Sequence, residues 1–235
     1  GSMFFLTLNL IQVQGYSATA AGAAFLPFVL IMFVLSRWSG GLVDRFGARL
    51  PLITGPLIAS AGFAMFAIPG RDADYWTGFF PAVLVLGLGM AISVAPLTTT
   101  VMSSVKEEQA GIASGANNAV SRAAGLLAIA VFGVVLLQTF SRSLNSRLQH
   151  INIPDTVRWE VLNQRVKLAG MELPDNLPAA QQTQLRQAVA DSFISGYRLT
   201  MFIAAGLGLA SAATAWWFIG RKAKYRTGSE ATAFK

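Results

Sequence analysis

Hydrophobic residues form long uninterrupted runs along this chain, and the charged residues gather in the short stretches between them. From Gly1 to Ser36 no charged residue occurs. Four further stretches are equally free of charge: residues 50–70, 75–105, 123–141 and 199–220. Because a helix rises about 1.5 Å per residue, about 20 apolar residues cross the roughly 30 Å hydrocarbon core of a bilayer. The pattern therefore predicts membrane-spanning helices rather than a soluble core.

The predicted fold class is an all-α integral membrane protein, with one partial and four complete membrane helices in residues 3–140. A last membrane helix is expected at residues 196–220. The first apolar segment, Met3–Val13, would cover only about 17 Å as a helix, which is too short to cross a bilayer. The longer predicted spans are Ala18–Trp38, Leu50–Ile68, Trp76–Met102, Ile112–Thr139 and Gly196–Gly220. Residues 1–2, Gly-Ser ahead of Met3, resemble the scar of a removed expression tag and are set aside.

Residues 141–195 form a long polar segment with a helical periodicity of its own. Val157 and Val161 recur at helical spacing in its first part, as do Leu185 and Val189 in its second part. Pro174 lies between the two parts as a helix breaker. We predict an extracytoplasmic hairpin of two amphipathic helices on the membrane surface. A disordered loop with chance periodicity is the alternative.

The distribution of charge changes the picture in one respect, because it predicts an orientation. The net charge is +7, but only 12% of the residues are charged and the basic ones stand at the ends of apolar runs. This placement indicates a lipid bilayer, not a nucleic acid, as the partner. If the spans alternate, the basic residues of loops 37–49 and 106–108 and of the tail 221–235 share one side. The positive-inside rule makes that side cytoplasmic, so the C-terminus is expected in the cytoplasm of a multi-pass inner (plasma) membrane protein.

Candidate catalytic chemistry is scarce. The chain has no cysteine, its one histidine (His150) lies in a polar loop, and no carboxylate lies inside a predicted span. No nucleophile with a neighbouring base and no cluster of metal ligands is recognisable. We therefore expect neither an enzyme nor a bound metal or cofactor.

Residues 40–49 read Gly-Gly-Leu-Val-Asp-Arg-Phe-Gly-Ala-Arg and resemble the signature G-x-L-x-D-R-x-G-x-R of the major facilitator superfamily. In that family the signature follows the second helix of each six-helix half. The resemblance thus implies a six-helix half whose first helix, Met3–Val13, is truncated. Ala48 departs from the pattern, since the family often has a basic residue there. The implied cytoplasmic gating residues are Gly40, Leu42, Asp44, Arg45, Gly47 and Arg49.

The gating motif also has a physical logic. Gly40 and Gly41 would let two helix ends approach closely. The Asp44 carboxylate would accept hydrogen bonds from unpaired N–H groups at a helix start. Arg45 and Arg49 would bind carboxylates or the last carbonyls of neighbouring helices. The simpler interpretation is an ordinary tight basic loop.

Two further stretches narrow the resemblance. The sequence Gly111–Arg122 and the sequence Gln14-Gly15-Tyr16-Ser17 are similar to parts of the fourteen-helix drug:proton antiporters of the EmrB/QacA type. Members of that group carry a long external hairpin before the last helix. The resemblance covers nearly the whole chain and implies that it is the C-terminal half of such a transporter.

Five polar residues within or near the spans are candidates for a substrate cavity. In the family the first helix of a half lines the central cavity, which points to Asn9 and Gln12. Asn118 and Arg122 are one helical turn apart and share a face, with Asn117 beside them. The alternatives are hydrogen bonds to another helix for the amides, and an interfacial position next to lipid phosphate for the arginine.

The sequence therefore predicts half of a secondary active transporter, a proton-coupled exporter of small amphipathic compounds that works by alternating access. Its expected partners are lipid, the transported compound, protons, and either a missing N-terminal half or a second copy in a homodimer. The family's intramembrane carboxylates are absent from these spans, so a coupling acid would belong to a missing half, or this mechanism is not used. The alternative function is a non-transporting membrane module or remnant that acts only through helix packing or dimerisation.

Overall fold

A computed structural model describes residues 1–39, 41–174 and 177–219, and all regular secondary structure within these ranges is helical. The α-helices are α1 (Ser2–Gln12), α2 (Ala18–Ala23), α3 (Leu26–Ser39), α4 (Leu42–Phe46), α5 (Arg49–Phe66), α6 (Phe80–Ser103), α7 (Ala110–Leu148), α8 (Asp155–Asn163) and α9 (Ala179–Phe218). Short π- and 3₁₀-helical turns are η1 (Tyr75–Phe79), η2 (Glu107–Gln109) and η3 (Arg165–Gly170). Five helical segments are long and apolar enough to cross a membrane, whereas α1 is a short apolar helix. The all-α membrane fold with a short first helix is thus confirmed.

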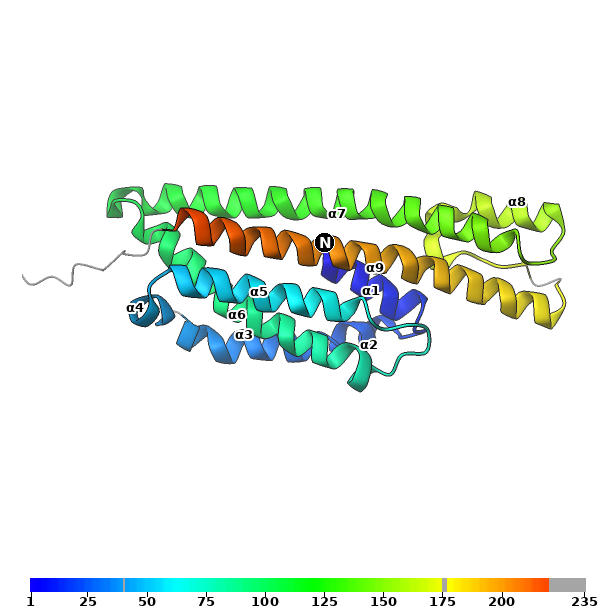
Figure 1. Cartoon of the computed structure of the whole chain (residues 1–235), viewed down its shortest axis with the longest axis horizontal. Helices are drawn as coiled ribbons and strands as arrows, with labels where there is room; N and C mark the ends of the chain where they lie inside the picture. The colour runs from blue at the N-terminus through cyan, green and yellow to red at the C-terminus, as the bar shows by residue number, and fades with distance from the viewer. Residues whose placement is uncertain (40, 175–176, 220–235) are drawn as a thin grey trace, which may run out of the picture.

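The long helices lie side by side along the long axis of the molecule (Figure 1). Helix α5 has α6 on one side and α9 on the other, α3 packs outside α6, and α7 packs outside α9. Helix α1 lies against α9 and α7. The end of the bundle that carries α4 is called the motif end, and the end that carries α8 is called the hairpin end (Figure 1). The start of α7 and the last turn of α9 lie at the motif end, so residues 41–49 and 106–108 share that end (Figure 1), whereas the basic tail 221–235 lies outside the described residues.

Small residues bring α5 close to α6. A methyl group at Gly62 of α5 would lie only 2.7 Å from the backbone nitrogen of Leu86 of α6. One at Gly89 of α6 would lie 2.8 Å from the carbonyl oxygen of Gly55 of α5. Inside a membrane, where lipid is as apolar as a leucine side chain, such close contact replaces the hydrophobic effect as the force that joins helices.

A row of buried side chains joins the second half of α7 to the first part of α9. On α7 the row has a spacing of four residues and runs through Leu136, Phe140, Leu144 and Leu148, all fully buried. On α9 it is met by equally buried side chains: Leu185, Val189, Phe193, Tyr197 and Met201. The buried apolar residues keep the same helical spacing beyond the ends of the charge-free segments. Both helices therefore continue without a break.

This continuity differs from the sequence-based helix boundaries. The predicted span Ile112–Thr139 corresponds to α7, which continues to Leu148. The predicted last span, Gly196–Gly220, corresponds to α9, which already begins at Ala179. The expected boundary between loop 141–195 and the last helix therefore falls inside α9. Of the two expected amphipathic helices, the first corresponds to α8 with η3, and the second is the beginning of α9.

The hairpin region extends the bundle lengthwise. Helix α8 packs against the extended end of α7, and its buried Val157 and Val161 belong to the same hydrophobic cluster as Leu185 and Val189 of α9. The Gln181 side chain donates a hydrogen bond to the carbonyl oxygen of Asn152 at 2.8 Å, which joins the start of α9 to the connection after α7. The segment thus prolongs the α7–α9 pair beyond the other helices (Figure 1), and its expected position on the membrane surface stays a prediction.

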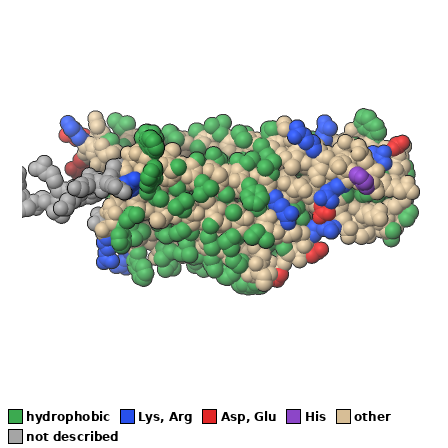
Figure 2. Space-filling model, viewed as in Figure 1, with side chains coloured by type: hydrophobic (Ala, Val, Ile, Leu, Met, Phe, Trp, Pro, Cys, Tyr) green, Lys and Arg blue, Asp and Glu red, His purple; other side chains and the backbone are tan. Residues whose placement is uncertain are grey.

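The surface agrees with a lipid environment. Hydrophobic side chains cover the middle of the visible face, and charged ones gather towards the two ends (Figure 2). Large apolar side chains such as Phe33 and Ile112 are more than three-quarters exposed. In α7 none of residues 110–131 is buried, and the first buried side chain is that of Phe132. The first half of α7 therefore has little helix cover within the described part of the chain.

Candidate functional site

The gating motif forms a tight connection between α3 and α5. Helix α4 ends at Phe46 and is capped by Gly47, whose N–H donates to the carbonyl oxygen of Val43 at 2.9 Å. Gly47 has φ +75° and ψ 164°, a backbone conformation that residues with a side chain rarely adopt. Helix α5 then begins at Arg49, with Pro51 in its first turn, where a missing N–H costs no hydrogen bond. The motif glycine at position 47 is thus required by the turn itself.

Arg49 connects the motif to the last membrane helix. Its guanidinium donates a hydrogen bond to the backbone carbonyl oxygen of Trp216 at 2.7 Å. The guanidinium carbon lies 5.8 Å from the centre of the Trp216 ring. Carbonyls in the last turn of a helix have no N–H partner within that helix and carry partial negative charge. Arg49 thus makes the contact with a helix C-terminus that the motif predicts, whereas its gating role stays a prediction.

Two further motif residues, Leu42 and Arg45, line a cavity of about 500 Å³ at the motif end. It is lined by Arg37, Trp38, Gly41, Leu42, Arg45 and Phe46. A methyl group at Gly41 would lie 3.6 Å from the carbonyl oxygen of Trp38, an ordinary contact. The expected close approach of two helix ends is therefore not required at Gly41. The expectations for Gly40 and for the Asp44 side chain lie outside the described residues.

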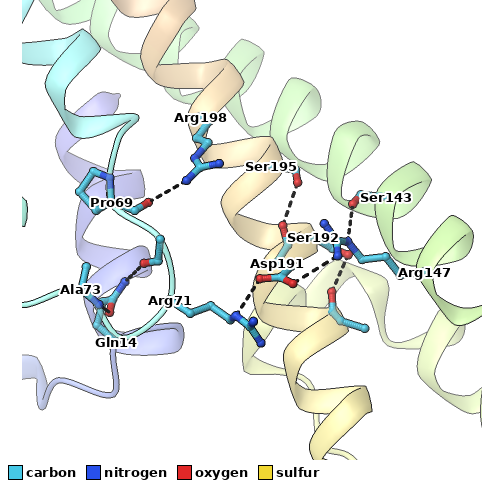
Figure 3. A network of polar contacts seen from close by, with 12 residues as sticks. Gln14, Pro69, Arg71, Ala73, Ser143, Arg147, Asp191, Ser192, Ser195 and Arg198 are labelled. Carbon is cyan, nitrogen blue, oxygen red and sulfur yellow. Dashed lines mark hydrogen bonds and ion pairs between the residues drawn. The ribbon is translucent and has the colours of Figure 1, made fainter. Parts of the chain in front are cut away.

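A polar network at the hairpin end joins segments that are far apart in sequence (Figure 3). The Asp191 carboxylate of α9 pairs with Arg147 of α7 at 3.2 Å and with Arg71 of the loop after α5 at 2.9 Å. Two turns further along α9, the guanidinium of Arg198 donates to the carbonyl oxygens of Ile68 and Pro69, at 3.2 and 3.5 Å. The network fixes the end of α5 against the α7–α9 pair.

Gln14 connects α1 to the same loop. Its amide nitrogen donates to the carbonyl oxygen of Gly70 at 2.9 Å, and its amide oxygen accepts from the N–H of Ala73 at 3.1 Å. The side chain of Asn9 is buried in the interior, where its oxygen accepts from Gln14 at 3.4 Å. Asn9 therefore contacts a side chain just beyond its own helix, and its place in a substrate cavity stays a prediction.

The five candidate cavity residues do not come together. Gln12, at the end of α1, lines a cavity of about 790 Å³ at the hairpin end. Asn117, Asn118 and Arg122 lie in the first half of α7, near the motif end, where Asn118 and Arg122 are exposed. The structure keeps the last two one turn apart, but it places them far from Gln12.

Sequence reasoning missed the network around Asp191. One signal could have revealed it, since Asp191 is the only carboxylate between Pro178 and Gly220 and stands next to apolar positions of a helix. An acid in that position is costly unless it is paired. Its partners, Arg71 and Arg147, come from other segments, and nothing in their local sequence indicates the pairing.

Comparisons with known proteins agree with the motif. Residues 1–129 match the family model of the Major Facilitator Superfamily. The chain is 29% identical over 218 residues to the tetracenomycin C resistance and export protein of Streptomyces glaucescens, covering 92% of this chain and 40% of the relative. It is 28% identical over 216 residues to the multidrug resistance protein Stp of Mycobacterium tuberculosis, covering 86% of this chain and 38% of the relative. It is 29% identical over 234 residues to a tetracycline resistance determinant of Streptomyces rimosus, covering 93% of this chain and 67% of the relative.

The chain thus spans about two fifths of the length of the first two relatives, 40% and 38%. The matched residues 1–129 include the short first helix, the gating motif and most of the exposed half of α7. This match extends over more than half of the chain, and this chain belongs to the Major Facilitator Superfamily of membrane transporters.

Proposed function

We propose that this chain is the C-terminal half of a secondary active exporter of small amphipathic compounds, of the fourteen-helix drug:proton antiporter type. The observation that carries the proposal is the alignment of nearly the whole chain, 92% and 93%, with relatives named for drug export and resistance. The position of the motif, between a membrane-length helix and α5 with only the short α1 ahead, supports it further.

Alternating access in such a transporter moves two halves against each other as nearly rigid bodies. The described contacts suit one rigid body: glycines hold α5 to α6, Arg49 holds α5 to α9 at the motif end, and Asp191 holds α7 and α9 to the α5 loop at the hairpin end. The uncovered first half of α7 supports a second half that packs there. That half is either an N-terminal domain or a second copy of this chain.

Proton coupling in this proposal depends on a carboxylate outside the chain. The acids in the described membrane-length helices lie at their ends: Glu107 and Glu108 at the motif end, and Asp191 at the hairpin end in its arginine pairs. None of them lies in the apolar middle of a span, where a coupling acid of this family is expected.

The proposed orientation places the motif end in the cytoplasm and the hairpin end outside, in an inner (plasma) membrane. Since the chain has no cysteine, single cysteines can report this directly. In intact cells, a membrane-impermeant maleimide should label Arg165→Cys in the hairpin, but Glu107→Cys only after permeabilisation. The reverse pattern would overturn the orientation.

Transport is tested in proteoliposomes that contain a pH-sensitive dye, with tetracycline as the probe compound. The chain is reconstituted alone and as the product of its full reading frame, including any coding sequence upstream of Met3. Tetracycline-dependent proton flux from the full product supports the exporter, and flux from the chain alone identifies the second copy as the other half. Absence of flux from both preparations would favour the alternative, a membrane module without transport.

A further inference from the structure

A cavity of about 790 Å³ lies at the hairpin end. It is enclosed by the end of α1, by α8, by residues 169–174 and by α9. Its lining includes Gln12, Glu160, Met171, Arg186 and Val189.

The wall of this cavity is built by specific hydrogen bonds. The side-chain amide of Gln164 donates to the carbonyl oxygen of Glu172 at 3.0 Å and accepts from the N–H of the same residue at 3.1 Å. This paired contact holds residues 171–173 in an extended conformation beside α8. Met171 and Val189, which line the cavity, are buried and give it an apolar floor.

The rim of the cavity carries opposite charges that do not neutralise each other. Glu160 stands on α8 and Arg186 on α9, and both are exposed. Neither forms an ion pair with a described residue, although both line the same cavity. The third charged residue of the lining, Glu172, lies 3.9 Å from Lys167 and so has a cation of its own.

Gln12 supplies a third recognition group. Its amide oxygen is buried and accepts no hydrogen bond from any described residue. A buried acceptor without a donor is unfavourable, so the Gln12 amide gains when it turns this oxygen towards an N–H or O–H group of a ligand in the cavity. The amide nitrogen lies beside Gly170, where an added methyl group would be 3.0 Å from it.

We propose that this cavity is a binding site for small amphipathic zwitterions. The ammonium group of the ligand lies towards Glu160, its carboxylate lies towards Arg186, and an N–H donor meets the Gln12 oxygen. The apolar body of the ligand rests on Met171 and Val189. Ligand binding at this site can be measured on the purified chain alone. A negative result would therefore refute the site without refuting the proposed transport function.

Three related fluorescent probes test the charge requirement. Nε-dansyl-lysine is a zwitterion with an apolar dansyl group, its methyl ester is a cation, and its Nα-acetyl derivative is an anion. Titrated into the purified chain in a neutral detergent, the zwitterion should bind about tenfold more tightly than either derivative, since each derivative loses one charge-assisted contact. Equal binding of all three probes would mean partition into the detergent micelle and would overturn the proposal.

Substitutions then assign each contact. Glu160→Gln should weaken binding of the zwitterion and the ester but not of the acetyl derivative, and Arg186→Gln should weaken the zwitterion and the acetyl derivative but not the ester. Gln12→Leu should weaken binding of the zwitterion without lowering the unfolding temperature, since it removes an unpaired buried oxygen. Arg165→Gln, in the same hairpin but outside the cavity lining, is the matched control and should change nothing. Zwitterion binding that is unaffected by the first two substitutions would refute the site.

Discussion

The guanidinium of Arg49 at the start of α5 lies over the indole of Trp216 at the end of α9 and donates a 2.7 Å hydrogen bond to its carbonyl oxygen, across 167 positions of sequence. This one side chain joins the gating motif to the last membrane helix. Any movement that separates these two helix ends must first break the contact. The pair is therefore where the proposed rigid body can be tested at the motif end.

We predict that Arg49→Lys destabilises the chain although it keeps the charge. A lysine ammonium lacks the planar group that stacks on an indole while it donates to a carbonyl. Loss of the stacking and of one hydrogen bond should cost about 1–2 kcal/mol, or a few degrees in unfolding temperature. Circular dichroism of the detergent-purified protein during heating measures this shift.

The matched control for Arg49 is Arg45→Lys. Arg45 is exposed and makes no hydrogen bond or ion pair with a described residue, so its replacement should leave the unfolding temperature unchanged. Equal shifts for the two substitutions would show that the Trp216 contact contributes nothing of its own.

Asp191→Asn should loosen the hairpin end of the bundle. The substitution removes the carboxylate that pairs with both Arg71 and Arg147, side chains that are 35% and 43% exposed. Because exposed ion pairs contribute only up to about 1 kcal/mol each, the global effect should be small. The local effect should be clear, with faster hydrogen exchange of the Ala73 amide, which is held by Gln14 in the same loop.

The control for this substitution is Asp155→Asn, which removes a local i,i+3 pair with Arg158 whose carboxylate side is 89% exposed. It should leave exchange in the loop after α5 unchanged. High salt should also reduce the difference between Asp191→Asn and the original chain, since it screens exposed ion pairs. A difference that persists in high salt would indicate that Asp191 acts through packing.

The membrane-spanning segments could be predicted from the sequence, but the extension of α7 and α9 into the hairpin region could not. Charge-free runs identify lipid-facing helices because lipid excludes charge from every face. Beyond Thr139 the outer face of α7 becomes polar while Leu144 and Leu148 keep the buried face apolar. The continuation of such a helix is marked by the four-residue spacing of its buried apolar side chains. The charge-free run alone places the helix end too early.

The motif shows a similar limit. The turn at Gly47 follows from the spacing of the motif, and the kind of partner bound by Arg49 could be expected from the chemistry of helix ends. The identity of Trp216 could not, because only the three-dimensional arrangement of α5 and α9 brings the two residues together. The same holds for Gln12, whose cavity is formed by segments more than a hundred residues further along the chain.

Gly62→Ala should destabilise the α5–α6 contact. The added methyl group would lie 2.7–2.9 Å from the backbone and Cβ of Leu86, so the two helices must separate. Overpacking of this kind costs about 1–3 kcal/mol. At Gly206 of α9 an added methyl group meets nothing within 4 Å, so Gly206→Ala should be neutral or slightly stabilising. Thermal unfolding of the two variants in detergent compares them, and equal stability would contradict the close packing of α5 on α6.

Two tyrosines allow a matched test of buried hydroxyl groups. Tyr75, the first residue of η1, donates a 2.7 Å hydrogen bond to the carbonyl oxygen of Ala24. This bond holds η1 against the end of α2. Tyr197 is 1% exposed and stacks on Phe193, but its hydroxyl has no hydrogen-bond partner among the described residues. The same chemical change, removal of one oxygen atom, should therefore have opposite effects at the two positions.

Tyr75→Phe should cost about 1 kcal/mol, because a made hydrogen bond is lost and the Ala24 carbonyl is left without its donor. Tyr197→Phe should be neutral or stabilising by a similar amount, because it removes a polar group that is buried without a partner and keeps the stacked ring. Unfolding temperatures of both variants, measured side by side in one detergent, decide the matter. A clear loss of stability in Tyr197→Phe would show that its hydroxyl is bound by a group from outside this chain, such as an ordered water or a neighbouring helix of the second half.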